Sequence, residues 1–175
     1  ERLNLLSYDL VVSSSHCAAK GVITRSDAVH LCYCHTPMRY AWDLYDKYFP
    51  RSLLYTTIFK SLRLWDVVSA ARVDRFIANS RTIRERIKKI YRRSADVLPP
   101  PVDTDYFTPA ARAKEGEYYL VVSALVPYKN IELAIGACNQ LSRRLIVVGN
   151  GSEFRRLSAL AGPTVQMLGG VDDAR

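Results

Sequence analysis

The sequence predicts an α/β protein built from two parallel-sheet units that a proline-rich linker joins. Apolar, strand-like runs alternate with helical patterns along most of the chain, which favours βαβ units. Runs such as "LVVS" and "LIVV" are apolar at consecutive positions, as in strands that are covered on both faces. The alternation is interrupted by "LPPPVDTDYFTPAARAKEGEYY", whose prolines, aspartates and charged run indicate a linker. We therefore expect Rossmann-like domains over 1–98 and 119–175, with a linker over 99–118.

The first unit is expected to contain four strands and two long helices. In chain order these are a strand over 9–13, a strand over 30–34, a helix over 52–71 that follows an irregular aromatic segment, a strand over 75–79, a helix over 80–92 and a short strand over 95–98. The second helix is expected to begin at Ser80 or Thr82. Thr82 and Glu85 have the spacing of a capping box, which favours the later start.

The second unit repeats the alternation more compactly. We expect strands over 119–123, 145–148 and 165–168 and helices over 130–141 and 152–161. Lys129 would then stand in the first turn of a helix, where a cation faces the positive end of the helix dipole. Because the chain lacks an initiator Met and stops where a new element starts, both units are expected to be incomplete.

Charge and composition narrow the classes of partner. Twenty-five basic and seventeen acidic residues give a net charge of +8, most of it in the first 110 residues, which favours anionic partners. The longest nearly uncharged apolar run, 118–128, is about half the length of a membrane-spanning helix, and no signal-peptide pattern opens the chain. The four cysteines form no CxxC pair, so we expect reduced thiols and a cytoplasmic protein.

Candidate functional residues follow the predicted strands, because ligands of open parallel sheets collect at the carboxyl ends of the strands. The segments that follow strands are Ser14-Ser15-His16, His35-Thr36-Pro37, Asn79-Ser80-Arg81, Pro127-Tyr128-Lys129 and Gly149-Asn150-Gly151. Lys129 is the most informative, since an anion such as a diphosphate over the helix N-terminus would compensate both the dipole and the ammonium.

Several of these features also have simpler interpretations. His30, Cys32 and Cys34 share one face of a strand and could bind zinc, but buried cysteines usually pack as small hydrophobic residues, so we expect no metal. His35 is either structural or catalytic. "GNGSEF" is either a plain turn or a backbone surface for a ligand, since Phe154 replaces the third glycine of a dinucleotide fingerprint. No GxxxxGK[ST] loop is present, which argues against a nucleoside triphosphatase.

Two segments rich in charge or aromatic residues also leave alternatives open. "SRTIRERIKKIYRR" at 80–93 carries seven basic residues and one acidic residue, and its basic face is either solvated or docks on anionic lipid or nucleic acid. The aromatic run at 39–49 either stacks on sugars or bases or only packs.

Long segments of the chain resemble one enzyme family. "HTPMRYAWD", "FIANSRTIRERIKKIYRRSADVLPPPVDTDYF", "YYLVVSALVPYKNIELAIGACNQL", "LIVVGNGSEFRRL" and "VQMLGGVDDAR" resemble retaining glycosyltransferases of family 4, also called group 1, and most closely bacterial mannosyltransferase-like members that build surface polysaccharides. The resemblance implies the GT-B fold, with an acceptor-side domain followed by a nucleotide-sugar domain. It also implies retaining transfer of a hexose, mannose from GDP-mannose, to a saccharide or lipid-linked acceptor, with no metal and no cofactor besides the donor.

The resemblance assigns roles to residues of this chain. It implies that Lys129 stabilises the departing nucleotide diphosphate and that His35 lies near the reacting sugar. The donor-binding residues it implies are Val126, Pro127, Lys129, Asn130, Gly149, Gly151, Leu168 and Gly169. The acceptor-binding residues it implies are His16, Arg39, Asn79, Ser80 and Arg81.

The chain departs from the family pattern at two places. Ala124 and Asn130 stand where many relatives have Arg, which removes cations from the diphosphate site. The family's pair of glutamates, seven residues apart, would lie beyond Arg175, so we expect these 175 residues alone to be inactive.

Other functions remain possible from the sequence alone. A non-catalytic basic module could bind anionic lipid or nucleic acid through 80–93, and a GT-B relative could be a sugar-nucleotide epimerase. With the transferase interpretation we expect no nucleic-acid partner, and we expect peripheral contact of 80–93 with the inner face of the plasma membrane.

Overall fold

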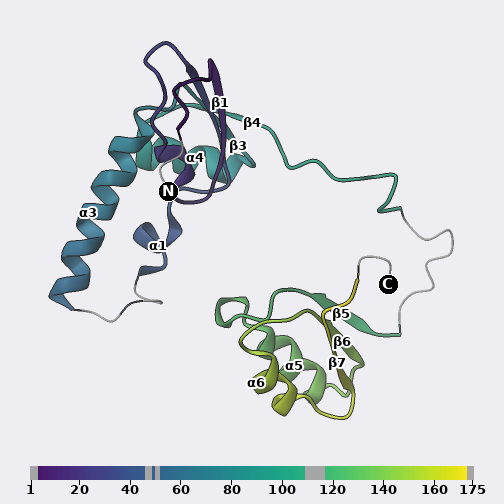
Figure 1. The fold of residues 1–175 in the computed structure, drawn as a ribbon. Helices are drawn as coiled ribbons and strands as arrows, with labels where there is room; N and C mark the ends of the chain where they lie inside the picture. Colours follow the sequence, from purple (N-terminus) through teal and green to yellow (C-terminus); the bar gives the residue numbers. More distant parts are fainter. Residues whose placement is uncertain (1–3, 46–48, 50–51, 109–116, 173–175) are drawn as a thin grey trace. The chain divides into compact units, whose positions relative to one another are not determined.

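The computed structural model describes residues 4–45, 49, 52–108 and 117–172, and its fold is α/β with two parallel sheets (Figure 1). The chain divides into two compact units, Glu1–Asp103 and Thr104–Arg175. The boundary falls inside the predicted linker, of which residues 109–116 lie outside the described residues, as do 46–48 of the aromatic run. Each unit is therefore considered by itself.

The first unit contains a four-stranded parallel sheet in the order β1-β2-β3-β4. Its strands are β1 (Leu10–Ser15), β2 (Val29–Cys34), β3 (Arg75–Ala78) and β4 (Ala95–Val97). In the register, Ser15 lies opposite Cys34 and Cys34 opposite Ala78. The residues that follow these three strands therefore leave the sheet at one edge, as the sequence predicted.

Among the described residues of this unit, the helical segments beside the sheet are η1 (Ala19–Gly21), α1 (Arg39–Trp42), α3 (Leu53–Ala70) and α4 (Arg81–Tyr91). Ser52 caps α3 by accepting a hydrogen bond from the amide of Tyr55. No helix in the described ranges is long and apolar enough to cross a membrane.

The structure decides between the two predicted starts of α4: Ser80 is confirmed, and the capping box at Thr82 and Glu85 is wrong. The cap is Ser80, whose hydroxyl accepts a hydrogen bond from the amide of Ile83. Ser80 has the extended backbone that an N-cap requires, whereas Thr82 is already inside the helix.

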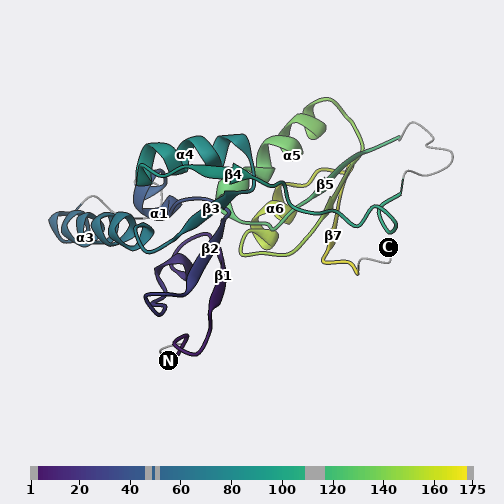
Figure 2. The same cartoon turned by 90° about the horizontal axis from the view of Figure 1, so that it is seen from above.

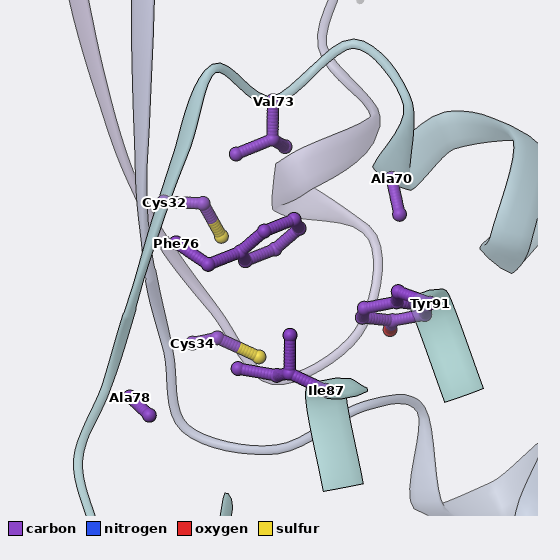
Figure 3. Packing of buried hydrophobic residues seen from close by; sticks show 8 residues of the cluster. All are labelled: Cys32, Cys34, Ala70, Val73, Phe76, Ala78, Ile87 and Tyr91. Carbon is purple, nitrogen blue, oxygen red and sulfur yellow. The ribbon is translucent and has the colours of Figure 1, made fainter. Parts of the chain in front are cut away.

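The first hydrophobic core lies between one face of the sheet and the helices α3 and α4, which are neighbours over that face (Figures 2 and 3). Cys32 and Cys34 of β2 point into it beside Phe76 of β3, opposite Ile87 and Tyr91 of α4. The two cysteines thus pack as small apolar side chains, as the sequence predicted.

The second unit is a three-stranded parallel sheet in the order β5-β6-β7. Its elements are β5 (Tyr119–Val122), η2 (Pro127–Lys129), α5 (Ile131–Gln140), β6 (Leu145–Val148), α6 (Phe154–Leu160) and β7 (Val165–Gly169). Leu145 and Val147 of β6 pack against Ile135 of α5 and Leu157 of α6, and all four are buried. Figure 1 shows both helices on one side of this sheet.

The expectation that the strands are covered on both faces is wrong for the described residues. Val12 of β1 is 65% exposed, and Val122 of β5 is 71% exposed. An apolar strand can be buried on both faces only where helices cover both faces, and the helices described here cover one face of each sheet. The opposite face of each sheet carries the exposed apolar side chains.

Candidate active site at the carboxyl ends of the strands

His35 follows β2 and is held by hydrogen bonds to β1. Its Nε2 lies 2.8 Å from the Oγ of Ser14, and its amide donates to the carbonyl of Ser15 at 2.8 Å. The Tyr33 ring meets the imidazole edge to face, with ring centroids 5.2 Å apart. The His35 side chain is exposed on the uncovered face of the sheet, so its imidazole is oriented and accessible to a ligand.

Ser14 is a site residue that the sequence analysis placed in a loop. β1 extends to Ser15, two residues further than predicted, so Ser14 is a strand residue. In the register Ser14 lies opposite Tyr33, which places Ser14 on the same face as His35. The i, i+2 spacing of Val12 and Ser14 in the sequence is compatible with one face of a strand. That His35 is the partner of Ser14 follows only from the register of β1 against β2.

Asn79 and Ser80 join His35 at the same edge. The Nδ2 of Asn79 donates to the backbone carbonyl of His35 at 3.3 Å, and the Ser80 hydroxyl donates to the side-chain Oδ1 of Asn79 at 3.1 Å. The structure therefore brings three of the predicted residues together. His16, Arg39 and Arg81 lie at the starts of neighbouring segments and are exposed, but none of them bonds to this cluster within the described residues.

His30 differs from His35 because it is fully buried. Its Nε2 lies 2.8 Å from the Ser13 hydroxyl, and its backbone amide donates to the Asp74 carboxylate at 2.7 Å. Burial lowers the pKa of His30 below its ordinary value, because the charged form loses hydration. His30 thus belongs to the interior of the first unit and not to its accessible edge.

The position of Lys129 corrects the sequence analysis. Lys129 is the last residue of the 3₁₀ turn η2, not a residue in the first turn of α5. Asn130 adopts the left-handed conformation, at φ 50°, and reverses the chain before α5 begins at Ile131. Asn tolerates this conformation better than most residues, so the sequence favours a break here.

The ammonium of Lys129 is accessible to a ligand. Its Nζ lies 5.6 Å from the centroid of the Tyr128 ring and forms no ion pair with any described residue. The N-cap of α5, Asn130, makes no side-chain capping bond, so the first amides of that helix lack a side-chain acceptor. Helix amides of this kind beside an accessible cation form an arrangement that suits an anion.

Gly149 and Gly151 are required by the packing of the chain itself. A Cβ on Gly149, which has φ +137°, would lie 1.8 Å from the carbonyl oxygen of Ser123, and one on Gly151 would lie 2.1 Å from that of Leu125. The amide of Leu125 also donates to the carbonyl of Asn150 at 2.9 Å. The 149–151 turn is thus packed backbone to backbone against the segment that follows β5, which favours the plain-turn interpretation of the glycines.

A groove of about 780 Å³ lies on the uncovered face of the second sheet. Of the predicted donor residues, Gly149 and Leu168 line the groove. Asn150, which belongs to a candidate segment but was given no role, and Ser123, which was not predicted, line it as well. The remaining predicted donor residues lie outside its lining: Val126, Pro127, Lys129, Asn130, Gly151 and Gly169. Asn150 also accepts a hydrogen bond from the amide of Gly170 at 3.1 Å, which fixes the mouth of the groove.

Two parallel-sheet α/β units are the parts from which the GT-B fold is built, and a comparison with solved structures agrees with that fold. The chain is similar to the crystal structure of a point mutant of S. aureus TarM in complex with Fondaparinux, alpha-GlcNAc-glycerol and UDP, with a TM-score of 0.58 and 13% sequence identity over 83% of this chain. At that identity the likeness concerns the fold. The chain spans 29% of the TarM chain.

The family follows from a second comparison. The model of Glycosyltransferase Family 4 matches residues 1–106, more than half of the chain, so the chain belongs to this family. No curated protein matches the chain.

Proposed function

We propose that this chain forms part of a retaining, metal-independent glycosyltransferase that moves a hexose, mannose from GDP-mannose, to a saccharide or lipid-linked acceptor in cell-surface polysaccharide synthesis. The observation that carries the proposal is the exposed ammonium of Lys129, which has no ionic partner among the described residues, beside the uncapped N-terminus of α5. Family membership supports the class of reaction. TarM was crystallised with UDP and alpha-GlcNAc-glycerol, which supports a nucleotide and a sugar-bearing molecule as ligands.

The donor diphosphate matches the chemistry of this turn. The negative charge on its oxygens would accept hydrogen bonds from the first amides of α5 and from the ammonium of Lys129. As the glycosidic bond breaks, negative charge grows on the departing diphosphate, and a cation already in place stabilises it. The chain's own residues therefore supply what leaving-group stabilisation requires.

The acceptor side is proposed to lie at the edge of the first sheet. The imidazole of His35, oriented by Ser14, and the side chains of Asn79 and Ser80 present donors and acceptors for sugar hydroxyls. His16, Arg39 and Arg81 are exposed at the same edge and would extend this surface.

Nucleotide binding tests the donor side on the chain as it stands. Titration calorimetry should detect binding of GDP, and NMR should show amide shifts at 126–131. Lys129→Ala should weaken binding by about tenfold or more, because a charge-assisted hydrogen bond is lost. Arg155→Ala on α6 is the matched control, an exposed cation that should leave binding unchanged. Equal effects of the two substitutions would contradict the assignment of Lys129.

Product analysis tests the reaction. The assay uses a longer protein that contains these 175 residues, because the 175 residues alone are expected to be inactive. With GDP-mannose and a saccharide acceptor, a retaining transferase should give an α-linked product from the α-linked donor. An epimerised nucleotide sugar and an unchanged acceptor would instead identify an epimerase.

We also propose that the protein is cytoplasmic and contacts the inner face of the plasma membrane through α4. Arg84, Lys88 and Arg92 are exposed and, with Arg93, line a groove of about 540 Å³, in which Glu85, paired with Arg84 at 3.1 Å, also takes part. This cationic surface fits anionic lipid headgroups.

A further inference from the structure

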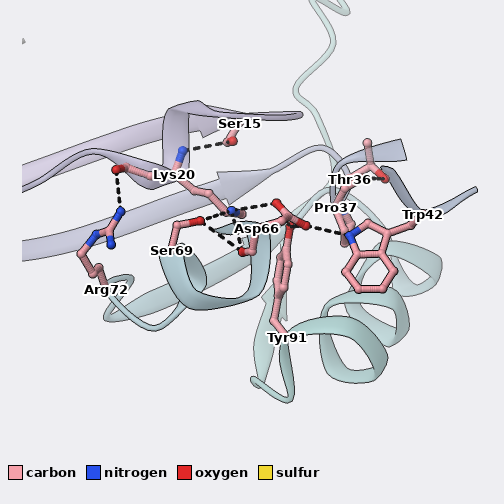
Figure 4. Close-up of polar contacts among 10 residues, drawn as sticks. Ser15, Lys20, Thr36, Pro37, Trp42, Asp66, Ser69, Arg72 and Tyr91 are labelled. Carbon is pink, nitrogen blue, oxygen red and sulfur yellow. Dashed lines mark hydrogen bonds and ion pairs between the residues drawn. The ribbon is translucent and has the colours of Figure 1, made fainter. Parts of the chain in front are cut away.

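A buried ion pair lies beneath the candidate acceptor edge of the first unit (Figure 4). The side chain of Lys20 in η1 is 1% exposed and that of Asp66 in α3 is 0% exposed. The Nζ of Lys20 lies 2.9 Å from Asp66 Oδ1, and it donates to the Asp66 carbonyl at 2.9 Å and to the Ser69 hydroxyl at 2.6 Å. All three protons of the ammonium therefore have acceptors.

The carboxylate of Asp66 receives hydrogen bonds from two further elements. The indole Nε1 of Trp42, in α1, donates to Oδ2 at 2.8 Å. The hydroxyl of Tyr91, in α4, lies 3.1 Å from both carboxylate oxygens. As Figure 4 shows, one carboxylate on α3 thus joins η1, α1 and α4.

Two of these elements end the loops that carry candidate site residues. η1 ends the loop that begins with His16 after β1, and α1 ends the loop that begins with His35 after β2. The loop after β1 has other attachments: the amide of Lys20 donates to the Ser15 hydroxyl at 3.2 Å, and a Cβ on Gly21 would lie 2.5 Å from the Trp65 ring. The loop after β2 is also held by Arg63, whose Nε donates to the Ala41 carbonyl at 2.6 Å. Within the described residues, the Asp66 carboxylate forms an ion pair with one loop and accepts a hydrogen bond from the other.

Stability alone does not require a buried ion pair. Apolar residues of similar volume usually serve as well or better, because two charges must be removed from water to form the pair. Buried polar groups instead can select one arrangement among several of similar energy, since their hydrogen bonds are directional.

We propose that Asp66 is a positioning residue, whose carboxylate fixes the loop after β1 relative to the loop after β2 and so sets His16 and His35 for the hydroxyls of a saccharide acceptor. The positioning of the loops is inferred from the ion pair and the hydrogen bonds of Asp66 within this unit. Its consequence for the acceptor rests on the proposed transferase function.

Hydrogen exchange of the 175-residue chain, read by mass spectrometry, tests the positioning. Asp66→Asn should raise exchange at 16–21 and 36–42 by about tenfold or more, while β2 and β3 keep their protection. Asp27→Asn is the matched control, since it removes an exposed carboxylate paired with Arg25 and should change neither loop. Unchanged exchange of both loops in a folded Asp66→Asn chain would overturn the proposal.

A second variant separates positioning from stability. The double variant Lys20→Met, Asp66→Leu replaces the ion pair by apolar side chains and should be more stable than Lys20→Met alone, because it leaves no buried charge unpaired, although Trp42 Nε1 and the Tyr91 hydroxyl lose their acceptor. We expect both loops to exchange faster than in the wild type even so. Wild-type protection of the loops in this variant would show that the ion pair only fills the core, and it would overturn the proposal.

A third, milder variant keeps the ion pair. Trp42→Phe removes one hydrogen bond to Asp66 and should speed exchange at 36–42 but not at 16–21. Unchanged exchange at 36–42 would overturn the proposal even if the other variants fail to fold.

Kinetics link the loops to the acceptor. The transfer assay uses a longer protein that contains these 175 residues, because the 175 residues alone are expected to be inactive. In that protein the double variant should raise the KM for the acceptor with little change in GDP binding, which depends on the second unit. If the wild type transfers no sugar, the proposed function is wrong. The positioning of the loops is still tested, because hydrogen exchange measures it without the transfer assay. If the wild type is active and the acceptor KM of the double variant is unchanged, the role toward the acceptor fails.

Discussion

Lys20 and Lys129 occupy corresponding places in the two units, yet their environments are opposite. Each follows the first strand of its sheet and lies in a 3₁₀ turn, η1 or η2. Lys20 is buried and paired with Asp66, whereas Lys129 is exposed and pairs with no carboxylate in the described residues. The buried ammonium of Lys20 has no donor left for a ligand, whereas the exposed ammonium of Lys129 keeps its donors.

The loops at the carboxyl edge of each sheet are fixed within their own unit, and by different kinds of contact in the two units. Side-chain contacts through Asp66 fix the loops of the first unit. In the second unit, backbone contacts of Gly149 and Gly151 with the segment 123–125 fix the turns. Because backbone packing holds the second edge, Lys129 is not needed there as a structural cation.

The largest expected effect is the difference in free energy of unfolding between the variants Lys20→Met and Lys129→Met. Lys20→Met leaves the Asp66 carboxylate buried without a cation, and should lower the free energy of unfolding by about 3–5 kcal/mol. Lys129→Met should change it by less than about 0.5 kcal/mol, because the side chain is exposed. Urea unfolding followed by circular dichroism measures both. Similar losses for the two variants would break the comparison.

The next effect tests the backbone contacts of the second unit. Gly149→Ala forces a Cβ into the Ser123 carbonyl at positive φ, and should lower the free energy of unfolding by about 3 kcal/mol. Gly136→Ala, in α5, is the control, since a Cβ there meets nothing within 4 Å and should stabilise by about 1 kcal/mol. Thermal unfolding reports both, and a neutral Gly149→Ala would show that the turn is not packed as described.

The effect of histidine titration on the free energy of unfolding should be confined to the first unit, because all three histidines precede residue 36. The pKa of His30 is lowered in the folded state by burial, with the Asp74 carboxylate at its amide opposing this change. The unfolded chain therefore binds more protons below the ordinary pKa of 6.5. Stability contributed by His30 is fully present above that pH and is lost as the pH falls below it toward the folded-state pKa.

Urea unfolding at a series of pH values checks this effect. Fluorescence reports the first unit, since Trp42 and Trp65 both lie there. A pKa that differs by one unit between the folded and unfolded states changes the free energy of unfolding by about 1.4 kcal/mol. His30→Leu should flatten the dependence between about pH 7 and pH 5, and an unaltered slope would contradict the role of His30.

The smallest effect concerns the basic face of α4. Lys88→Gln should weaken binding to vesicles that contain phosphatidylserine by about 1 kcal/mol, and the binding should decline as salt increases. Arg155→Gln, on α6 of the second unit, is the matched control and should have no effect. Vesicle sedimentation measures both, and equal losses would show that the attraction depends on net charge and not on α4.

Several predictions from the sequence are confirmed by the fold. The parallel sheets, the helix that begins after Ser52 and the burial of Cys32 and Cys34 all follow from apolar patterns that neighbouring residues determine. The roles assigned to Lys129 and His35 stay predictions, although both side chains are accessible at the carboxyl edges of their sheets.

Other features depended on residues far apart in the chain. Asp66 lies 46 residues from Lys20, and no local pattern marks either as a buried ion. The contact of Ser14 with His35 depends on strand register, and the uncovered sheet faces depend on where the helices pack. The sequence by itself determined the elements and the order of the candidate residues, because propensity and periodicity act over a few residues. Only the tertiary structure decided which lysine is buried, since the partner that neutralises a charge can come from any part of the chain.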